Sequence, residues 1–383
     1  MLYGERLENM DEFEIMASAT FGLEAVVKRE VEDLGYAITE STDGRVVFRG
    51  DERAVVRANL WLRSADRVYI KLAEFEARSF EELFQGAGAV EWGDIVPSDG
   101  KTVVVGTSVK SVLHSVPDCQ AIIKKAIANR LCEKYHVEWL EETGAEFVVR
   151  FMIHKDRVLL LLDTSGAGLH KRGYRTFDVS APIKETLAAA MVGLSFYKPG
   201  RLLLDPMCGS GTIAIEAAMM ARGIAPGLSR SFAAQEWGLI PRELWQEEKK
   251  AAFGSIDYGA DVHIEASDID GKAVRAAQQN AIEAGVDDCI SFRVDNVNKL
   301  RREEEYGIII TNPPYGIRIG EQEEMDRIYR SLSTFLRYSP TWSLFLITAD
   351  KSFEKKMGRP ADRRRKLYNG RLETCYYQYH GIK

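Results

Sequence analysis

The chain lacks the features that mark several classes of protein. None of its 383 residues lies in an apolar run long enough to span a bilayer, and the segment Met1 to Asp11 carries acidic residues but no apolar core of a signal peptide. Its five cysteines are scattered, odd in number and free of any Cys-x-x-Cys pair. That pattern argues against a disulfide framework and against a zinc site. We therefore expect a cytoplasmic protein with neither a membrane partner nor a metal.

A surplus of positive charge is also missing. The formal net charge is −6, whereas proteins that bind nucleic acid often have a basic balance, so any basic surface must be local. One local group is Lys171, Arg172, Arg175 and Lys184, and a second contains six Arg or Lys residues between Arg359 and Arg371. Solvated loops with surplus charge would produce the same two clusters.

The length and the residue pattern predict more than one domain. A chain of 383 residues is longer than one hydrophobic core usually serves. The glycine-containing segment from Ser165 to Gly168 follows a strand-like run, Val158 to Leu162. The pattern of apolar and polar residues changes after this segment, so we place a domain boundary there. Before it, short β-rich runs alternate with amphipathic helical patterns, notably Phe21 to Leu34 and Cys119 to Tyr135. This first part reads as a small α/β or α+β module.

Beyond residue 168 the pattern is strand, turn and helix, repeated. Apolar runs without alternation, joined by helices, predict a parallel, doubly wound sheet. Two further strand-like runs flank Asn369-Gly370, a strong hairpin signal that would add antiparallel edge strands. The predicted strands are Leu202 to Leu204, Val262 to Ala266, Ile290 to Val294, Ile308 to Ile310 and Leu344 to Thr348, and the helices are Ile213 to Met220, Ala273 to Ala284 and Met325 to Arg337.

A glycine turn follows the first strand of this sheet. It reads Asp205-Pro206-Met207-Cys208-Gly209-Ser210-Gly211-Thr212 and leads into a helix. In an open parallel sheet the ligand crevice lies beyond the carboxyl ends of the strands, where glycines let the backbone approach a ligand closely. The third glycine of a dinucleotide fingerprint is missing. No Gly-Lys-Ser/Thr follows either, which argues against a phosphate-cradling P-loop.

Acidic residues end the next two strands. Asp268 stands at the tip of the second strand, where a carboxylate can accept both hydroxyls of a ribose. We expect Asp270 to cap the following helix. Asp295 follows the third strand and could accept from an adenine amine. Carboxylates at such positions also serve as plain caps and turn residues.

The apolar run Ile308 to Thr311 ends in Asn312-Pro313-Pro314-Tyr315. Two prolines cannot continue a sheet, because neither offers a backbone N–H, so they fix a rigid ledge. The Asn312 amide oxygen can accept from an exocyclic amine, and the Tyr315 ring can stack on a base. The same four residues would also make an ordinary turn.

Taken together, these residues resemble the class I S-adenosylmethionine-dependent amino-methyltransferases. The resemblance implies that Asp205, Cys208, Gly209, Gly211 and Thr212 hold the methionine part of the cofactor. It assigns Asp268, with Ile269 beside it, to the ribose and Asp295 to the adenine. Asn312, Pro313, Pro314 and Tyr315 would hold the target amine as the catalytic residues.

Outside these motifs the chain resembles bacterial RNA methyltransferases that carry an N-terminal THUMP domain. The segments that carry this likeness are Val109 to Ser111, Pro117 to Gln120, Lys124 to Ile127, Leu169 to Arg175, Ala181 to Leu187 and the insertion Ala225 to Trp237. The family implies a ferredoxin-like part at residues 1–60, a THUMP domain at 61–165 and a Rossmann-like catalytic domain with a seven-stranded, mostly parallel sheet at 166–383.

The same resemblance implies a substrate and a partner. It implies formation of N2-methylguanosine in large-subunit ribosomal RNA, although close cousins modify transfer RNA. The RNA contacts would fall on the few basic residues available, and affinity should fall steeply with salt. The expected contacts are Lys110, Lys124, Lys125, Lys171 and Arg172.

Three other functions remain open at the level of sequence. A nicotinamide dehydrogenase also uses a glycine turn and an acidic strand tip, but it leaves Asn312 to Tyr315 unexplained. A DNA adenine methyltransferase shares that tetrapeptide, and the THUMP-like half counts against it. An RNA-binding assembly factor with a vestigial catalytic half would keep the RNA surface and lose the chemistry.

Overall fold

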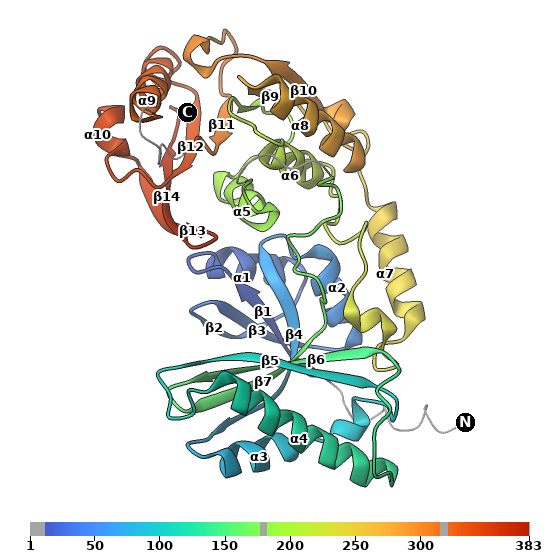
Figure 1. The fold of residues 1–383 in the computed structure, drawn as a ribbon. Helices are drawn as coiled ribbons and strands as arrows, with labels where there is room; N and C mark the ends of the chain where they lie inside the picture. Colours follow the sequence, from blue (N-terminus) through green and yellow to red (C-terminus); the bar gives the residue numbers. More distant parts are fainter. Residues whose placement is uncertain (1–11, 177–181, 315–320, 383) are drawn as a thin grey trace.

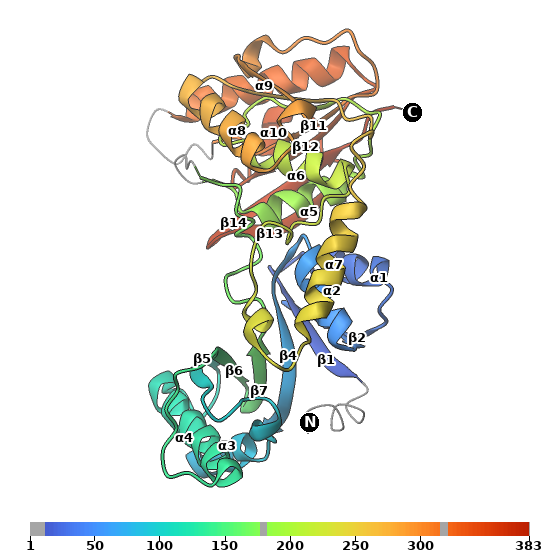
Figure 2. The same cartoon turned by 90° about the vertical axis from the view of Figure 1, so that its right-hand side faces the viewer.

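The computed structural model describes residues 12–176, 182–314 and 321–382. It has two lobes, one above the other in Figure 1, and each is built on a seven-stranded sheet. Figure 2 shows the same two lobes from the side, with helix α7 running along the lower one. The predicted fold class is confirmed: an α+β module precedes a Rossmann-like domain. Within the described ranges no helix is long and apolar enough to cross a membrane.

The sheet of the N-terminal lobe has the order β2-β3-β1-β4-β7-β6-β5. Only β5 and β6 pair in parallel, and the other neighbours are antiparallel. The long strand β4 pairs with β1 on one side and β7 on the other, so the sheet is continuous. Its strands are β1 (Phe13–Ala19), β2 (Ile38–Thr42), β3 (Arg45–Gly50), β4 (Ala65–Glu76), β5 (Lys101–Val109), β6 (Glu146–His154) and β7 (Arg157–Asp163).

The helices of this lobe share one large core with the sheet. Successive side chains of a strand point to opposite faces, so Val149 and Phe151 are buried in this core, while Met152, between Phe151 and Ile153, is exposed. Helix α3 begins with a capping box in which the side chains of Ser79 and Glu82 each bond the other's backbone N–H. The four helices are α1 (Glu24–Asp33), α2 (Glu52–Trp61), α3 (Phe80–Gly88) and α4 (Val116–Tyr135).

The C-terminal lobe has the sheet order β10-β9-β8-β11-β12-β14-β13. The first five strands are parallel, and β14 and β13 are antiparallel, as the hairpin signal at Asn369-Gly370 predicts. One buried cluster contains residues of α5, α6 and α8, and a second contains residues of α9 and α10. The strands are β8 (Leu203–Asp205), β9 (Ile264–Asp268), β10 (Ile290–Val294), β11 (Ile308–Thr311), β12 (Ser343–Thr348), β13 (Arg363–Asn369) and β14 (Leu372–Tyr379). The helices are α5 (Glu185–Ser195), α6 (Thr212–Ala221), α8 (Gly271–Glu283), α9 (Glu321–Tyr338) and α10 (Phe353–Met357).

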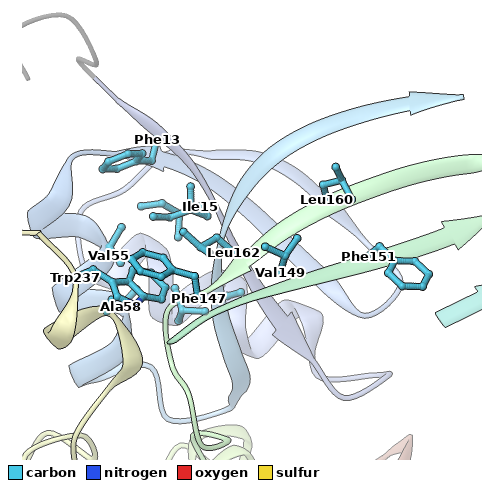
Figure 3. Packing of buried hydrophobic residues seen from close by; sticks show 14 of the residues in the cluster. Phe13, Ile15, Val55, Ala58, Phe147, Val149, Phe151, Leu160, Leu162 and Trp237 are labelled. Carbon is cyan, nitrogen blue, oxygen red and sulfur yellow. The ribbon is translucent and has the colours of Figure 1, made fainter. Parts of the chain in front are cut away.

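The insertion between α6 and β9 fastens the catalytic lobe to the N-terminal one. Trp237 from this insertion stacks on Phe147 of β6 with ring centroids 5.0 Å apart, inside the N-terminal core (Figure 3). Gly227 donates its N–H to the Leu60 carbonyl at 2.9 Å. Helix α7 (Arg242–Gly254) then packs on α2, and its Trp245 joins the same core. Large aromatic side chains bury much apolar area, so the two lobes are held by a core-like interface.

Candidate active site

A large cleft opens at the carboxyl ends of the parallel strands. The strand order reverses between β8 and β11, and in open α/β sheets ligands bind at this switch point. The cleft has a volume of about 720 Å³, within the range of small-molecule sites. The predicted residues that line it are Asp205, Cys208, Gly209, Thr212, Asp268, Ile269, Asp295, Asn312, Pro313 and Pro314.

The glycine turn approaches the cleft through its backbone. Gly209 has φ +52° and donates its N–H to Oδ2 of Asp268 at 2.9 Å. Gly211 has φ +81° and stands at the N-cap of α6, and a Cβ there would lie 2.9 Å from Cβ of Ala277 on α8. Gly211 is not among the lining residues. It lets α6 begin and pack closely on α8, whereas the buried side chains of Cys208 and Thr212 lie at the cleft itself.

The acidic strand ends lie side by side. Asp268 accepts from Gly209 through one oxygen and from the Asp270 N–H, at 3.0 Å, through the other. Each carboxylate oxygen offers two lone pairs, so both can still accept a hydroxyl. Asp270 is the N-cap of α8, as predicted, because its side chain accepts from the Lys272 N–H at 2.8 Å. Asp295 is exposed, and its N–H donates to the Asp268 carbonyl at 3.0 Å.

A hydrogen bond connects the glycine turn to the strand that leads into the Asn-Pro-Pro ledge. Thr311, the last residue of β11, donates its hydroxyl to Oδ1 of Asp205 at 2.8 Å, and both side chains are buried. Burial raises the pKa of Asp205 to about 7, against the hydrogen bond from Thr311, which lowers it. Asp205 is therefore a carboxyl group that titrates near neutral pH at the floor of the cleft.

The ledge itself presents an unsatisfied acceptor. Oδ1 of Asn312 is buried and has no hydrogen-bond partner among the described residues. A buried amide oxygen without a partner is costly, and in native proteins such a group calls for a reason, of which a catalytic role is one. Pro313 is buried and Pro314 exposed, and both line the cleft. Tyr315, the fourth predicted catalytic residue, lies outside the described residues.

Several lining residues were not found from sequence. Lys184 lines the cleft, although the sequence shows it only as a member of a basic cluster. Asn369 and Gly370, at the tip of the β13–β14 hairpin, also line it, and the sequence predicts them only as a turn. Arg175 holds the loop before α5 in place, since it donates to the Ile183 carbonyl at 2.8 Å and to Oγ1 of Thr212 at 2.9 Å. The other additional lining residues are Pro182, Ile183, Pro206, Met207, Ser210, Ile213, Asn296, Val297, Asn298, Glu324, Ile328 and Leu372.

The five predicted RNA contacts lie in different surroundings. Lys110, Lys125 and Lys171 are exposed. The Lys124 ammonium is already paired with Glu142 and donates to Thr102.

The prediction for Arg172 is wrong. Its side chain is only 3% exposed, and it pairs with the fully buried Glu216 at 3.3 Å. Its guanidinium also donates to the Leu169 carbonyl at 2.6 Å and to the Arg63 carbonyl. A side chain enclosed in this way stabilises the interior and the joint with the N-terminal lobe, and it is not presented to RNA.

These features define a class of protein. The glycine turn and the two carboxylates at the ends of β9 and β10 suit a nucleoside cofactor on one side of the switch-point cleft. On the other side, the Asn312 amide oxygen, which has no partner among residues 12–176, 182–314 and 321–382, suits an amine. The protein is a class I S-adenosylmethionine-dependent methyltransferase.

Comparisons with known proteins identify the family. Residues 172–378 match the model of the RMKL-like methyltransferase domain, residues 14–69 that of the RlmL ferredoxin-like domain and residues 77–163 that of the THUMP domain. The chain belongs to the RMKL-like methyltransferase family. A relative from Bacillus subtilis (strain 168), named "Putative RNA methyltransferase YpsC", is 46% identical over 372 residues, which cover 97% of this chain and 96% of the relative.

Solved structures agree with this assignment. A crystal structure from Listeria monocytogenes str. 4b F2365, described as a predicted N6-adenine-specific DNA methylase, is 46% identical with a TM-score of 0.93 and 98% coverage of both chains. The crystal structure of SMU.472 "complexed with SAH" is 40% identical with a TM-score of 0.93, covering 97% of this chain and 99% of the other. TrmN from Thermus thermophilus, 20% identical with a TM-score of 0.71 over 97% of this chain and all of the other, shares the fold.

Proposed function

We propose that the protein methylates the exocyclic N2 amine of a guanosine in RNA, with large-subunit ribosomal RNA as the substrate. The observation that carries the proposal is the buried Oδ1 of Asn312, which lines the cofactor cleft and has no hydrogen-bond partner in the part of the chain that the structure describes. An amide oxygen is an acceptor only, so it selects a group that bears protons, such as an amine. The THUMP match and the name of the Bacillus relative support RNA as the carrier of that amine.

The residues of the cleft would act by orientation. Oδ1 of Asn312 and the carbonyl of Pro313 accept the protons of the amine, so the nitrogen lone pair turns toward the glycine turn. When bound, the cofactor supplies a methyl group on a sulfonium, an activated donor that needs no enzyme nucleophile. Catalysis then consists of holding the nitrogen at near-attack distance and stabilising the positive charge that it gains. Tyr315 would stack on the base, and a paired guanine would first leave its helix.

One specific observation favours a second candidate. The Listeria structure is described as an N6-adenine-specific DNA methylase, and an exocyclic N6 amine would satisfy Asn312 equally well. The N-terminal lobe opposes this alternative, because its THUMP match accounts for about half of the residues before the catalytic domain. Transfer RNA is the alternative carrier of the guanosine.

The test is nucleoside mass spectrometry of ribosomal and transfer RNA from a strain that lacks the protein, followed by mapping of the affected position. We expect one N2-methylguanosine to disappear from the large ribosomal RNA and to return when the gene is restored. Restoration with an Asn312→Ala variant should leave the position unmethylated. Survival of every methylated guanosine at its normal level would overturn the assignment.

A further inference from the structure

The β13–β14 hairpin of the catalytic lobe reaches the N-terminal lobe. Its strand β13 meets the loop that precedes α1. The Arg365 guanidinium donates to the Gly22 carbonyl at 3.0 Å, and Leu367 shares a buried cluster with Leu23. Gly22 has φ +91°, and a Cβ there would lie 2.5 Å from the Lys366 carbonyl oxygen. The loop before α1 and the hairpin therefore fit together closely, and their relative position is fixed.

The same hairpin forms a wall of the active-site cleft. Asn369, Gly370 and Leu372 line the cleft. One residue before them, Tyr368 packs edge-on against the ring of Phe21, with centroids 6.0 Å apart at 75°. Phe21 comes from the N-terminal lobe and is 48% exposed. This aromatic rim, contributed by both lobes, thus lies one residue along the hairpin from the residues that line the cleft.

Positive charge accompanies these rings. The Lys366 ammonium lies 5.5 Å from the centre of the Tyr368 ring. Its ion pair with Glu373 is about half exposed on both sides, and such surface pairs contribute little, so a phosphate can take the place of the carboxylate. Arg371 at the hairpin turn is exposed, and Lys184 lines the cleft.

The ring of Phe21 is exposed and that of Tyr368 is half-buried. Accessible rings beside cations suit single-stranded nucleic acid, because bases stack on aromatic faces and phosphates pair with Lys and Arg. A target base that enters the cleft remains covalently attached to its neighbours, and these must pass its rim. We propose that the rim residues Phe21, Tyr368 and Lys366 hold the nucleotide adjacent to the target base. The base of that nucleotide stacks on Phe21, and its phosphate pairs with Lys366. This inference rests on the proposed function, and it adds a contact from the ferredoxin-like part to the active site.

The first experiment compares Phe21→Ala with Phe21→Trp and with the control Phe253→Ala. Phe253 is a similarly exposed phenylalanine on α7. The assay is methyl transfer from labelled S-adenosylmethionine to ribosomal RNA extracted from a strain without the protein. We expect Phe21→Ala to raise KM for the RNA about tenfold, Phe21→Trp to keep it near the wild-type value and Phe253→Ala to leave it unchanged. Affinity for the cofactor, measured by calorimetry, should be the same in all four proteins.

A KM for Phe21→Ala equal to that of Phe253→Ala, in protein that still binds cofactor and methylates RNA, would overturn the inference and leave the proposed function intact. Wild-type protein that methylates neither this RNA nor transfer RNA would overturn both. Lys366→Gln provides a second measurement. It should lower the slope of log affinity against log salt by about one, and an unchanged slope would remove the phosphate contact.

Discussion

At the scale of single residues, the hydroxyl of Thr311 joins the two halves of the cleft. It precedes the Asn-Pro-Pro ledge and donates to Asp205, which opens the glycine turn. Neither partner is exposed, so no water competes for the bond. The position of the amine acceptor is thereby tied to the position of the cofactor turn.

We expect Thr311→Val to lower kcat about tenfold and to change KM for the cofactor by no more than about twofold. The variant leaves the buried Asp205 carboxyl without this donor, at a cost of about 1–3 kcal/mol, and lets the ledge shift. Thr311→Ser keeps the hydroxyl and should retain most of the activity. The measurement is steady-state methylation of RNA by the three proteins. Equal kcat for Val and Ser would show that the hydroxyl positions nothing.

Asp205 predicts a pH dependence of stability. Its pKa is about 7 in the folded protein, raised by burial from an ordinary 3.8. Between these values the folded protein binds the proton more tightly than the unfolded chain, so the stability that this group confers falls as pH rises from about 4 to about 7, by up to about 4 kcal/mol. Asp205→Asn removes the titration. We expect the wild-type minus variant difference in thermal midpoint to become more negative from pH 5 to pH 8, and an invariant difference would contradict the raised pKa.

The residues of the site differ in how far the sequence could predict them. Asp268, Cys208, Gly209 and Asn312 lie at the cleft where the motifs place them, because strand ends and turns are local features. The packing role of Gly211 could not be predicted, since its close neighbour, Ala277, is distant in sequence. No pattern distinguishes an exposed arginine from a buried one, which is why Arg172 was assigned to RNA.

At the scale of elements, local signals located most helices and strands to within a few residues. Helix α6 (Thr212–Ala221) extends the predicted Ile213 to Met220 by one residue at each end, and β14 and β13 form the hairpin that Asn369-Gly370 predicts. Strand β9 ends at Asp268 rather than Ala266, so the carboxylate belongs to the strand itself. The continuity of β4 with β7 depends on pairing between residues 81 to 94 positions apart, from Glu76–Arg157 to Tyr69–Asp163, which no local pattern records.

The start of α6 is the element most sensitive to a small change. We expect Gly211→Ala to destabilise the fold by more than about 2 kcal/mol and to weaken cofactor binding, because its φ of +81° and the contact with Ala277 both oppose a Cβ. Gly285→Ala is the matched control, with φ +67° and no atom within 4 Å, and should cost about 1 kcal/mol without affecting the cofactor. Thermal unfolding and calorimetry with S-adenosylmethionine measure both effects. Similar losses of stability in the two variants would show that backbone strain is the whole cause and that the contact with Ala277 contributes nothing.

At the scale of the whole molecule, the lobes are joined by buried contacts. The insertion that carries Trp237 enters the N-terminal core, and the Arg172–Glu216 pair lies where the Arg63 carbonyl meets the catalytic lobe. Arg63 in turn donates to the Ile224 carbonyl at 2.7 Å. A substrate bound by the N-terminal lobe is therefore held at a fixed distance from the cleft.

Removing one partner of the buried Arg172–Glu216 pair should lower the stability of the fold more than removing both. We expect Arg172→Met to lower stability by about 3–5 kcal/mol, since it leaves the Glu216 carboxylate buried without its charge partner, and the double variant with Glu216→Met to recover part of the loss. The salt dependence of RNA affinity should not change in Arg172→Met at a temperature where it is folded. A reduced salt slope would restore Arg172 as an RNA contact.

The most direct test of the account is performed with purified protein, labelled S-adenosylmethionine and ribosomal RNA from a strain without the protein, followed by digestion to nucleosides and mass spectrometry. We expect label in N2-methylguanosine with wild-type protein and none with Asn312→Ala, although both should bind the cofactor equally. Label in N6-methyladenosine, or equal transfer by both proteins, would contradict it.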